Sequence, residues 1–378
     1  MALLLGGSAC SVGEERSNLH IQSNPAGAWL YLDGELAGET PYLVQSPLGV
    51  HQVRLVYPGY MPWENEVEIK TVHPFTVTAP LQRDPRGLAG LSPEAGIIPF
   101  GGVTVTVQAE KKTPGTAPVP APVTVTISND ILALQMPLRP ETGGYLPWQV
   151  IGGQETLSWG GMAWNVPGVS PAEWQYTVDG QDGYAWVHFF TGGKDRPLAS
   201  ATVALAAGMP YFVLSPGLEN PGPKEIAYRF VITAAVAMGE ATTLLVSREI
   251  TTSLVAGKKA TWPTYEGTDM RLAGHWSPNQ EVALSLLTPG AYLGAFTPRV
   301  NQVGQGGQVG QGGSGLVRVF PGYVVPEMRV IRQGQNLILE ASRAGTLPAK
   351  GGITWTERWY RIGNENEMDL GALSRRLW

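Results

Sequence analysis

Apolar and polar residues alternate with period two along much of the chain, and this pattern predicts β-strands. Between residues 19 and 81 it marks five short strands, at residues 28–32, 35–37, 51–56, 66–69 and 75–78. Asp33-Gly34 separates the first two strands. This pair suits the two-residue type I′ turn of a hairpin, because both central positions of that turn need φ > 0. The pattern therefore predicts a small β-sandwich over residues 18–82.

The alternation resumes at residue 97 and continues to residue 362. Examples are residues 103–107, 123–127, 186–190, 201–205, 228–232, 282–286 and 316–320. Helical periodicity is nearly absent, so the predicted fold class is all-β, with a large antiparallel β-sandwich over residues 97–362. Residues 83–96 are rich in turn formers and predict a linker, and residues 363–378 form a C-terminal tail. The Gly-rich stretch 301–315 predicts a loop between two strands.

Composition narrows the function. The 48 glycines, 31 prolines and only 15% charged residues are typical of short strands joined by turns. A net charge of -5 without a long Lys/Arg cluster lacks the basic surface that nucleic acids require, so we expect no nucleic-acid partner. The single cysteine allows no intrachain disulfide and too few ligands for a Cys-based metal site. We therefore expect no metal and no cofactor.

The N-terminal residues 1–17 carry a possible modification site. Leu3-Leu4-Leu5 is followed by small residues and then by Cys10, and the polar stretch Ser11 to Asn18 is expected to be a tether. This order resembles the processing site of bacterial lipoproteins, although the apolar run is short and no basic residue precedes it. The resemblance implies a lipid on Cys10 and a membrane-anchored, extracytoplasmic protein at the cell surface or in the periplasm. The alternative is a frayed N-terminus with an unrelated cysteine.

The small predicted sandwich also carries a family signature. Its landmarks are Asn24 to Ala28, Leu32-Asp33-Gly34, Gly38 to Pro41, Gly49-Val50-His51 and Pro58-Gly59-Tyr60. Residues 18–82 resemble the PEGA domain family at these positions. The resemblance implies a small extracytoplasmic sandwich without catalytic residues, which acts in spacing or adhesion.

A second resemblance extends over the large predicted domain. It rests on segments at residues 127–134, 214–220, 262–265, 292–296, 315–319 and 355–360. In their order these segments are similar to galactose-mutarotase-like supersandwich domains, which implies a sugar-binding β-sandwich. Enzymes of that family use a Glu as base and a His as acid, and by order along the chain Glu340 stands where the Glu is expected. No histidine follows Glu219-Asn220, where the family carries an Asn-His pair, so His188 or His275 would have to replace it.

The non-periodic segment around residues 262–276 is the candidate binding site. A sugar site combines aromatic rings, which cover the apolar face of the sugar, with carboxylates and other polar groups for its hydroxyls. Five residues fit this description: Trp262, Asp269, His275, Trp276 and, from a later strand, Glu340. The alternative is packing within the loop for the two tryptophans and a turn cap for Asp269.

Three functions remain open. The first is a cell-envelope lipoprotein whose large domain binds a carbohydrate or envelope glycan without catalysis, or contacts other surface proteins. The second is an enzyme of the aldose 1-epimerase type that uses Glu340 and a histidine. The third is a purely architectural role in a surface assembly. An enzyme requires Glu340 and a histidine to converge on one bound sugar within hydrogen-bonding distance.

Overall fold

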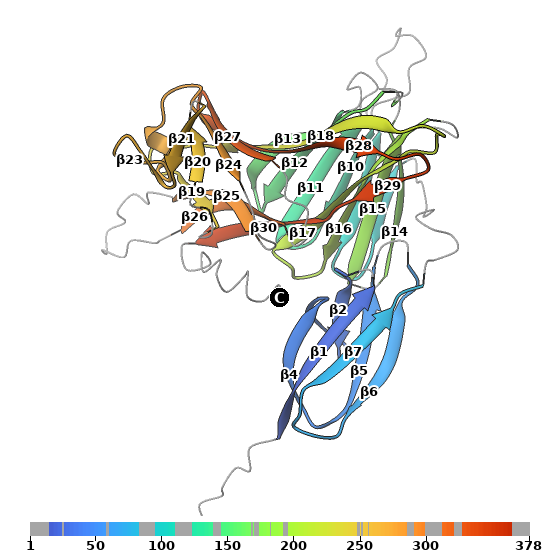
Figure 1. Ribbon diagram of the computed structural model, residues 1–378. Helices are drawn as coiled ribbons and strands as arrows, with labels where there is room; N and C mark the ends of the chain where they lie inside the picture. The colour runs from blue at the N-terminus through green and yellow to red at the C-terminus, as the bar shows by residue number, and fades with distance from the viewer. Residues whose placement is uncertain are drawn as a thin grey trace, which may run out of the picture. The chain divides into compact units, whose positions relative to one another are not determined.

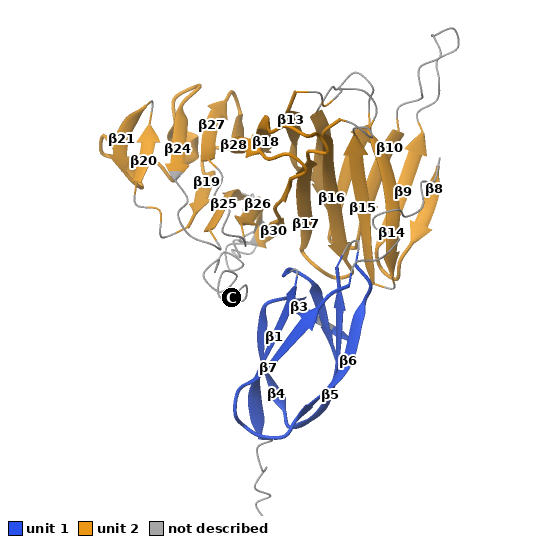
Figure 2. Cartoon of the chain, turned by 45° about the vertical axis from the view of Figure 1, so that its right-hand side comes forward, with its two compact units in different colours: residues 1–87, 371–378 blue, residues 88–370 orange. Residues whose placement is uncertain are grey.

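The structure is a computed structural model of the 378-residue chain. It describes residues 15–24, 26–57, 60–82, 95–109, 123–138, 145–167, 169, 174–181, 183–191, 196–247, 250, 252–255, 257–285, 291–298, 312–320 and 327–364. The chain divides into two compact units, residues 1–87 with 371–378 and residues 88–370 (Figure 2). In the described part of both units nearly every regular element is a β-strand, which confirms the all-β prediction. No helix in this part of the chain is long and apolar enough to cross a membrane.

The first unit consists of two small sheets whose apolar faces form one core (Figure 1). The strands are β1 (Arg16–Asn24), β2 (Trp29–Leu32), β3 (Glu35–Glu39), β4 (Tyr42–Pro47), β5 (Gly49–Val56), β6 (Trp63–Ile69) and β7 (Phe75–Pro80). One sheet has the order β4-β1-β7 and the other the order β3-β2-β5-β6. Leu19, Leu30 and Leu55 are fully buried between them. The sequence therefore predicted the sandwich, but β1 and β4 were missed as strands.

The hairpin between β2 and β3 turns as predicted. Asp33 and Gly34 have φ angles of 53° and 85°, so both central positions lie at positive φ. The Asp33 carboxylate also accepts the backbone N–H of Gln52 at 2.8 Å and lies 2.7 Å from Nδ1 of His51. His51 Nε2 lies 2.9 Å from the carbonyl oxygen of Pro47, so both ring nitrogens face acceptors. The geometry therefore fits a doubly protonated, positively charged imidazole.

We expect this contact to make the stability of the first unit depend on pH. Burial alone would lower the pKa of His51, but its hydrogen bonds with Asp33 and Pro47 raise it. Burial opposes the shift of Asp33 too, and the bonds from His51 and Gln52 lower the pKa of this carboxyl. The His51 contribution is then present below the ordinary histidine pKa of about 6.5 and is lost as pH rises through the folded pKa. The Asp33 contribution is present above its ordinary pKa and is lost as pH falls through the folded value.

Proton NMR titration of the five histidines checks this expectation. The signal that disappears in His51→Gln should titrate above the ordinary histidine range in the wild type. It should return towards that range in Asp33→Asn, since asparagine tolerates the positive φ of the turn but carries no charge. An unchanged pKa in Asp33→Asn would rule out the contact as the cause.

The second unit contains two large antiparallel sheets (Figure 1). The larger sheet has the order β23-β22-β21-β20-β24-β27-β28-β18-β13-β12-β11-β10-β9-β8. Its strands are β8 (Gly96–Pro99), β9 (Thr104–Ala109), β10 (Val123–Ser128), β11 (Leu132–Leu138), β12 (Tyr145–Gly152), β13 (Glu155–Asn165), β18 (Ile226–Ala237), β20 (Thr252–Val255), β21 (Lys258–Thr261), β22 (Thr264–Tyr265), β23 (Thr268–Asp269), β24 (Glu281–Ser285), β27 (Glu327–Gln333) and β28 (Asn336–Leu347). The predicted antiparallel arrangement of the large domain is therefore present.

The second sheet has the order β14-β15-β16-β17-β30-β26-β25-β19, and β29 adds to β17. Its strands are β14 (Gln175–Gln181), β15 (Tyr184–Thr191), β16 (Leu198–Ala206), β17 (Tyr211–Glu219), β19 (Thr243–Val246), β25 (Ala291–Pro298), β26 (Gly312–Phe320), β29 (Gly352–Thr354) and β30 (Glu357–Asn364). β26 begins at Gly312, so residues 312–315 of the predicted Gly-rich loop are part of a strand. Residues 301–311 lie outside the described residues.

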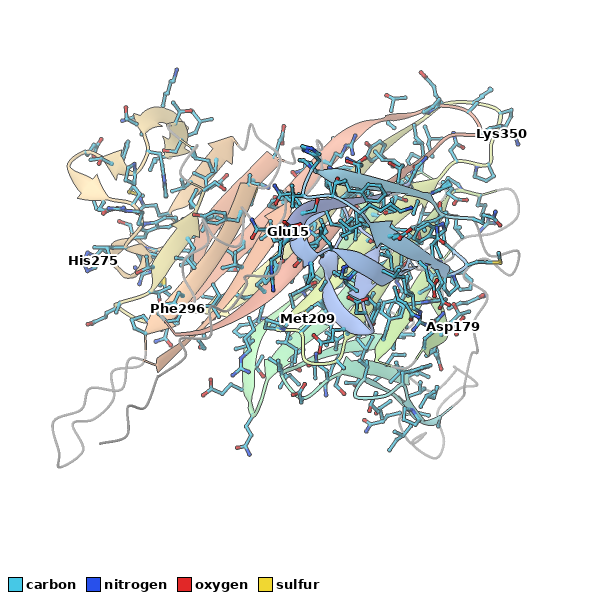
Figure 3. The ribbon with its side chains drawn as sticks, turned by 90° about the horizontal axis from the view of Figure 1, so that it is seen from below. Glu15, Asp179, Met209, His275, Phe296 and Lys350 are labelled. Atoms are coloured by element: carbon cyan, nitrogen blue, oxygen red, sulfur yellow. The ribbon has the colours of Figure 1, made fainter. Side chains whose placement is uncertain are left out.

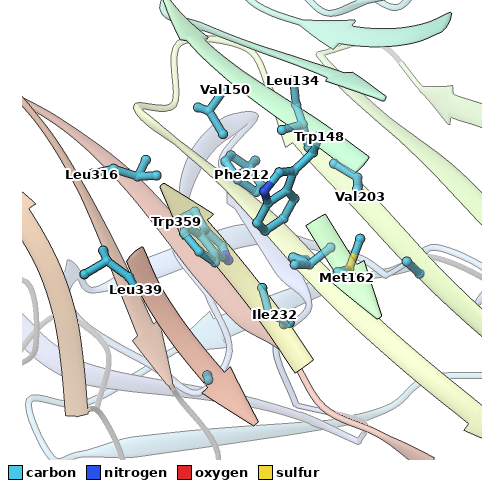
Figure 4. Packing of buried hydrophobic residues seen from close by; sticks show 14 of the residues in the cluster. Leu134, Trp148, Val150, Met162, Val203, Phe212, Ile232, Leu316, Leu339 and Trp359 are labelled. Carbon is cyan, nitrogen blue, oxygen red and sulfur yellow. The ribbon is translucent and has the colours of Figure 1, made fainter. Parts of the chain in front are cut away.

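The inward side chains of both sheets form one continuous core. At its centre the indole of Trp148 meets Trp359 edge to face, with ring centroids 5.0 Å apart (Figure 4). Phe212 lies 6.0 Å from Trp359 and nearly parallel to it, and it also meets Trp148 edge to face at 6.2 Å. Trp148 comes from the larger sheet and the other two from the smaller one, so these aromatic rings join the two sheets.

A buried ion pair lies beside this aromatic cluster. Arg318 of β26 and Glu357 of β30 are both fully buried, and Nη2 of the guanidinium donates to the two carboxylate oxygens at 2.9 and 2.7 Å. The guanidinium carbon of Arg318 lies 4.5 Å from the ring centroid of Trp359 and 5.0 Å from that of Phe320. Burial lowers the pKa of Arg318, and the charge of Glu357 opposes that shift.

Candidate functional site

The segment that carries most of the predicted site residues folds as a small extension of the larger sheet. Strands β20, β21, β22 and β23 follow one another as antiparallel neighbours. Glu266 and Gly267 take positive φ angles of 48° and 79° and close the hairpin between β22 and β23. The backbone N–H of Met270 donates to the carbonyl of Pro263 at 2.7 Å. We call residues 252–276 the tip segment.

The two tryptophans of the tip segment have different environments. Trp262 and Tyr265 are half-buried and pack against the core, so part of each ring faces solvent. Trp276 is only 2% exposed, and its indole N–H donates to the carbonyl of Met270 at 3.0 Å. Trp276 is therefore part of the core and does not offer a surface to a ligand.

Asp269 and Arg271 form a two-pronged ion pair at the surface of the tip segment. The guanidinium Nε and Nη2 of Arg271 lie 3.0 and 2.6 Å from the two carboxylate oxygens of Asp269. This contact lowers the pKa of Asp269 against the effect of burial and raises that of Arg271. The Asp269 carboxylate also accepts the backbone N–H of Arg271 at 2.9 Å, so it caps the turn as well. The pair presents a charged donor and a charged acceptor side by side.

His275 and Glu340 belong to different elements: His275 lies in a short helix and Glu340 on β28 of the larger sheet. His275 ends the 3-10 helix η2 (Ala273–His275) and is exposed at the periphery of the unit (Figure 3). The neighbouring Gly274 accepts a hydrogen bond from Arg332, whose partner across the sheet is Leu337. Leu337 precedes Glu340 by three residues, which is about 10 Å along a strand. The side chain of Glu340 is 14% exposed and accepts a hydrogen bond from Nε of Arg329 at 3.0 Å.

His188 lies on β15, in the smaller sheet. It is 9% exposed, its Nδ1 lies 2.9 Å from the hydroxyl of Thr202, and its ring stacks on Phe190. Burial lowers the pKa of His188 to about 4. The imidazole is therefore neutral at neutral pH and lacks the acidic second proton with which an imidazolium acts as a general acid.

Trp262, Asp269 and His275 thus lie in the tip segment, while Glu340 and His188 lie on other strands. Cys10 lies outside the described residues. Within the described ranges no three His, Cys, Asp or Glu side chains gather as metal ligands would.

Sequence reasoning missed a groove on the first unit. It has a volume of about 630 Å³ and lies on the outer face of the sheet that contains β2, β5 and β6. Tyr31, Arg54 and Glu64 stand in one row across these strands. The guanidinium of Arg54 lies 5.6 Å from the ring centroid of Tyr31, and its Nε lies 3.2 Å from the Glu64 carboxylate. The alternation of each strand showed which residues face outward, but not that a groove forms between them.

Comparisons with known proteins agree with the division of the chain into two units. The model of the PEGA domain matches residues 16–85, which confirms the predicted family of the first unit. No curated protein matches the chain. A TPR-domain containing protein from Parabacteroides distasonis has a similar solved structure, with a TM-score of 0.53 and 13% identity over 70% of this chain. The match spans 56% of the length of that protein. At this identity the likeness shows a shared fold and nothing about activity.

Galactose-mutarotase-like structures are also among the matches. One is a galactose mutarotase-like protein from Lactobacillus casei, with a TM-score of 0.42 and 10% identity over 63% of this chain and 100% of that one. Another is a galactose mutarotase related enzyme from Lactobacillus acidophilus, with a TM-score of 0.41 and 6% identity over 64% of this chain and 98% of that one.

Proposed function

We propose that this chain, whose residues 16–85 are a PEGA domain, is an extracytoplasmic protein of the cell envelope that binds carbohydrate through its large β-sandwich. In this proposal the PEGA domain is a spacer or adhesion module, and a lipid on Cys10 holds the protein at the membrane. Other surface proteins are possible neighbours. The sandwich binds a sugar without transforming it.

One observation carries the proposal. Two half-buried aromatic rings, Trp262 and Tyr265, stand in the same tip segment as the Asp269–Arg271 ion pair. A pyranose ring has an apolar face that stacks on aromatic rings, and its hydroxyls accept and donate hydrogen bonds. A carboxylate and a guanidinium held side by side offer charge-assisted acceptors and donors to adjacent hydroxyls. His275, exposed at the end of the same segment, adds another polar group.

The placement of the remaining residues favours binding over catalysis. Opening a sugar ring needs a base at the anomeric hydroxyl and an acid at the ring oxygen, both within hydrogen-bonding distance. The Glu340 carboxylate is already bonded to Arg329, and His275 lies in the 3-10 helix η2, outside the strand that carries Glu340. His188 is buried in the other sheet. These contacts support a non-catalytic site.

A glycan array probed with the full chain tests the proposal. We expect selective binding to a small set of glycans and a loss of about tenfold or more in affinity for Trp262→Ala, because removal of a stacking ring at a binding centre typically costs more than about 1.4 kcal/mol. Leu254→Ala is the matched control, since Leu254 is 48% exposed in the same tip segment but has no ring to stack. It should bind as the wild type does. Absence of glycan binding, or equal binding by Trp262→Ala, would contradict the proposal, and epimerase activity in the wild type would contradict its non-catalytic part.

A further inference from the structure

A second surface of the large sandwich combines an exposed aromatic ring with uncharged polar groups. Strands β9, β10, β11, β12 and β13 are consecutive neighbours in the larger sheet. The registers of the paired strands place one side chain from each strand in a single row across the sheet, in the order Thr106, Thr126, Gln135, Gln149 and Trp159. We call this row the cross-strand row.

The cross-strand row faces away from the core. Successive side chains of a strand point to opposite faces, and the residues on both sides of the first four row members are buried, as Val125 and Ile127 are around Thr126. The four Thr and Gln side chains are half-buried, and Trp159 is 42% exposed. Large aromatic side chains gain most from burial, so an exposed tryptophan in the middle of a sheet is an unusual position.

The surface beside the row on β9 to β12 is uncharged. Every outward position of β9, β10, β11 and β12 is occupied by Thr, Ser, Gln, Ala, Pro, Tyr or Ile. About a quarter of the residues of an ordinary soluble domain are charged, and charged residues concentrate on surfaces. A protein partner would be expected to meet several aromatic or Arg anchors within a polar rim. This face offers one exposed ring among hydroxyls and amides, with the exposed Ile97 of β8 beside Thr106. An uncharged, hydroxyl-rich ligand matches that composition.

The spacing of the row favours a polymer over a single sugar. Neighbouring strands lie about 4.8 Å apart, so the five side chains extend over roughly 19 Å. The step between strands is close to the length of one pyranose unit in a linear glycan, and a chain laid across the strands would meet one side chain per sugar. Gln149 is held in place, because its Nε2 donates to the Thr156 hydroxyl at 2.7 Å beside Trp159.

We propose that the outer face of β9 to β13 binds a linear, uncharged polysaccharide that lies across the strands and stacks one sugar on Trp159. This site goes beyond the proposed function, because it shares no residue with the tip segment and extends over several sugar units. The polar side chains of the cross-strand row supply hydrogen bonds along the polysaccharide. Because the row carries no charge, it offers no ion pair to an acidic or a basic polymer.

Affinity electrophoresis of the full chain tests this site. The gels contain one soluble neutral polysaccharide each, namely a β-1,3-glucan, a β-1,4-glucan derivative, a mannan or a xylan, and gels with alginate serve as the charged comparison. We expect at least one neutral polymer to retard the wild type and alginate to leave it unretarded. Trp159→Ala should weaken the retarding interaction by about tenfold, the effect of losing about 1.4 kcal/mol. Gln135→Glu, which brings a charge into the row without removing the ring, should weaken it as well.

The variant Trp262→Ala separates this site from the one in the tip segment. It should be retarded like the wild type, and the free monosaccharide should not release the protein from the polymer. If Trp262→Ala loses retardation while Trp159→Ala keeps it, the face of β9 to β13 is not the site. The proposal is equally overturned if no neutral polymer retards the wild type, or if alginate retards it as strongly. Thermal unfolding of Trp159→Ala, expected to match the wild type, excludes misfolding as the cause of a loss.

Discussion

Glu357→Ala is expected to lower the free energy of unfolding of the large sandwich by about 3–5 kcal/mol, because it leaves the guanidinium of Arg318 buried and unpaired. Both side chains are fully buried, and Glu357 also accepts the indole N–H of Trp355 at 3.3 Å. Nε and Nη1 of Arg318 already have no hydrogen-bond partner among the described residues. The carboxylate is therefore the main compensation for a buried positive charge. Chemical denaturation followed by circular dichroism measures the loss.

A double variant distinguishes the buried charge from the packing. Arg318→Met with Glu357→Leu removes both charges and keeps most of the apolar volume, so it should lose much less stability than Glu357→Ala alone. Charge removal from a fully buried pair can even be neutral when the replacement packs well. If the double variant is as unstable as the single one, lost volume rather than an unpaired charge explains the effect.

The fold of the first unit was largely predictable because short sequence motifs determine its turns. An Asp-Gly pair between two alternating runs specifies a hairpin through the backbone alone, and the φ angles of Asp33 and Gly34 agree with that. The two missed strands lacked such a local signal. β1 begins at Arg16, within a polar stretch expected to be a tether, and β4 exposes Leu43 at 57%, which blurs its apolar alternation. Both strands are held by pairing with residues far along the chain, as β1 is with β7.

The candidate site was predictable only as a set of residue types. Trp262 and Trp276 flank the same non-periodic segment, and nothing local to either one says which is buried. The difference arises from tertiary contacts: Trp276 bonds to Met270 within the core, while Trp262 remains partly open. The ion pair of Glu340 could not be predicted either. Its partner Arg329 lies on the neighbouring strand, and no motif in the sequence shows how the two strands pair.

The same reasoning explains why residues 312–315 form a strand. A Gly-rich stretch has no side chains to pack, and the sequence therefore predicted a loop there. In the structure the backbone of β26 lies close to Phe296, so that a Cβ added to Gly313 would meet the Phe296 ring at 2.2 Å. The glycine is required by its neighbour in β25, which is information that the local pattern does not contain.

Trp359→Ala is the second substitution for which we expect a large loss, about 3–5 kcal/mol of unfolding free energy. Trp359 is fully buried where the two sheets meet, in ring contact with Trp148 and Phe212 and beneath the guanidinium of Arg318. Its removal opens a cavity between the sheets and also takes away a cation–π contact. Denaturant unfolding of the full chain, followed by near-ultraviolet circular dichroism, measures the change.

Two further tryptophan variants show whether burial and ring packing cause this loss. Trp159→Ala removes the same side chain from the exposed face and should change the stability by less than about 0.5 kcal/mol. Trp359→Phe keeps an aromatic ring in the cluster and removes an indole N–H that has no hydrogen-bond partner within the described residues. Since an unsatisfied buried donor costs about 1–3 kcal/mol, losing it offsets part of the lost volume. Trp359→Phe should therefore lose less than half as much stability as Trp359→Ala, and equal losses would show that the indole as a whole, and not ring packing, stabilises this junction of the sheets.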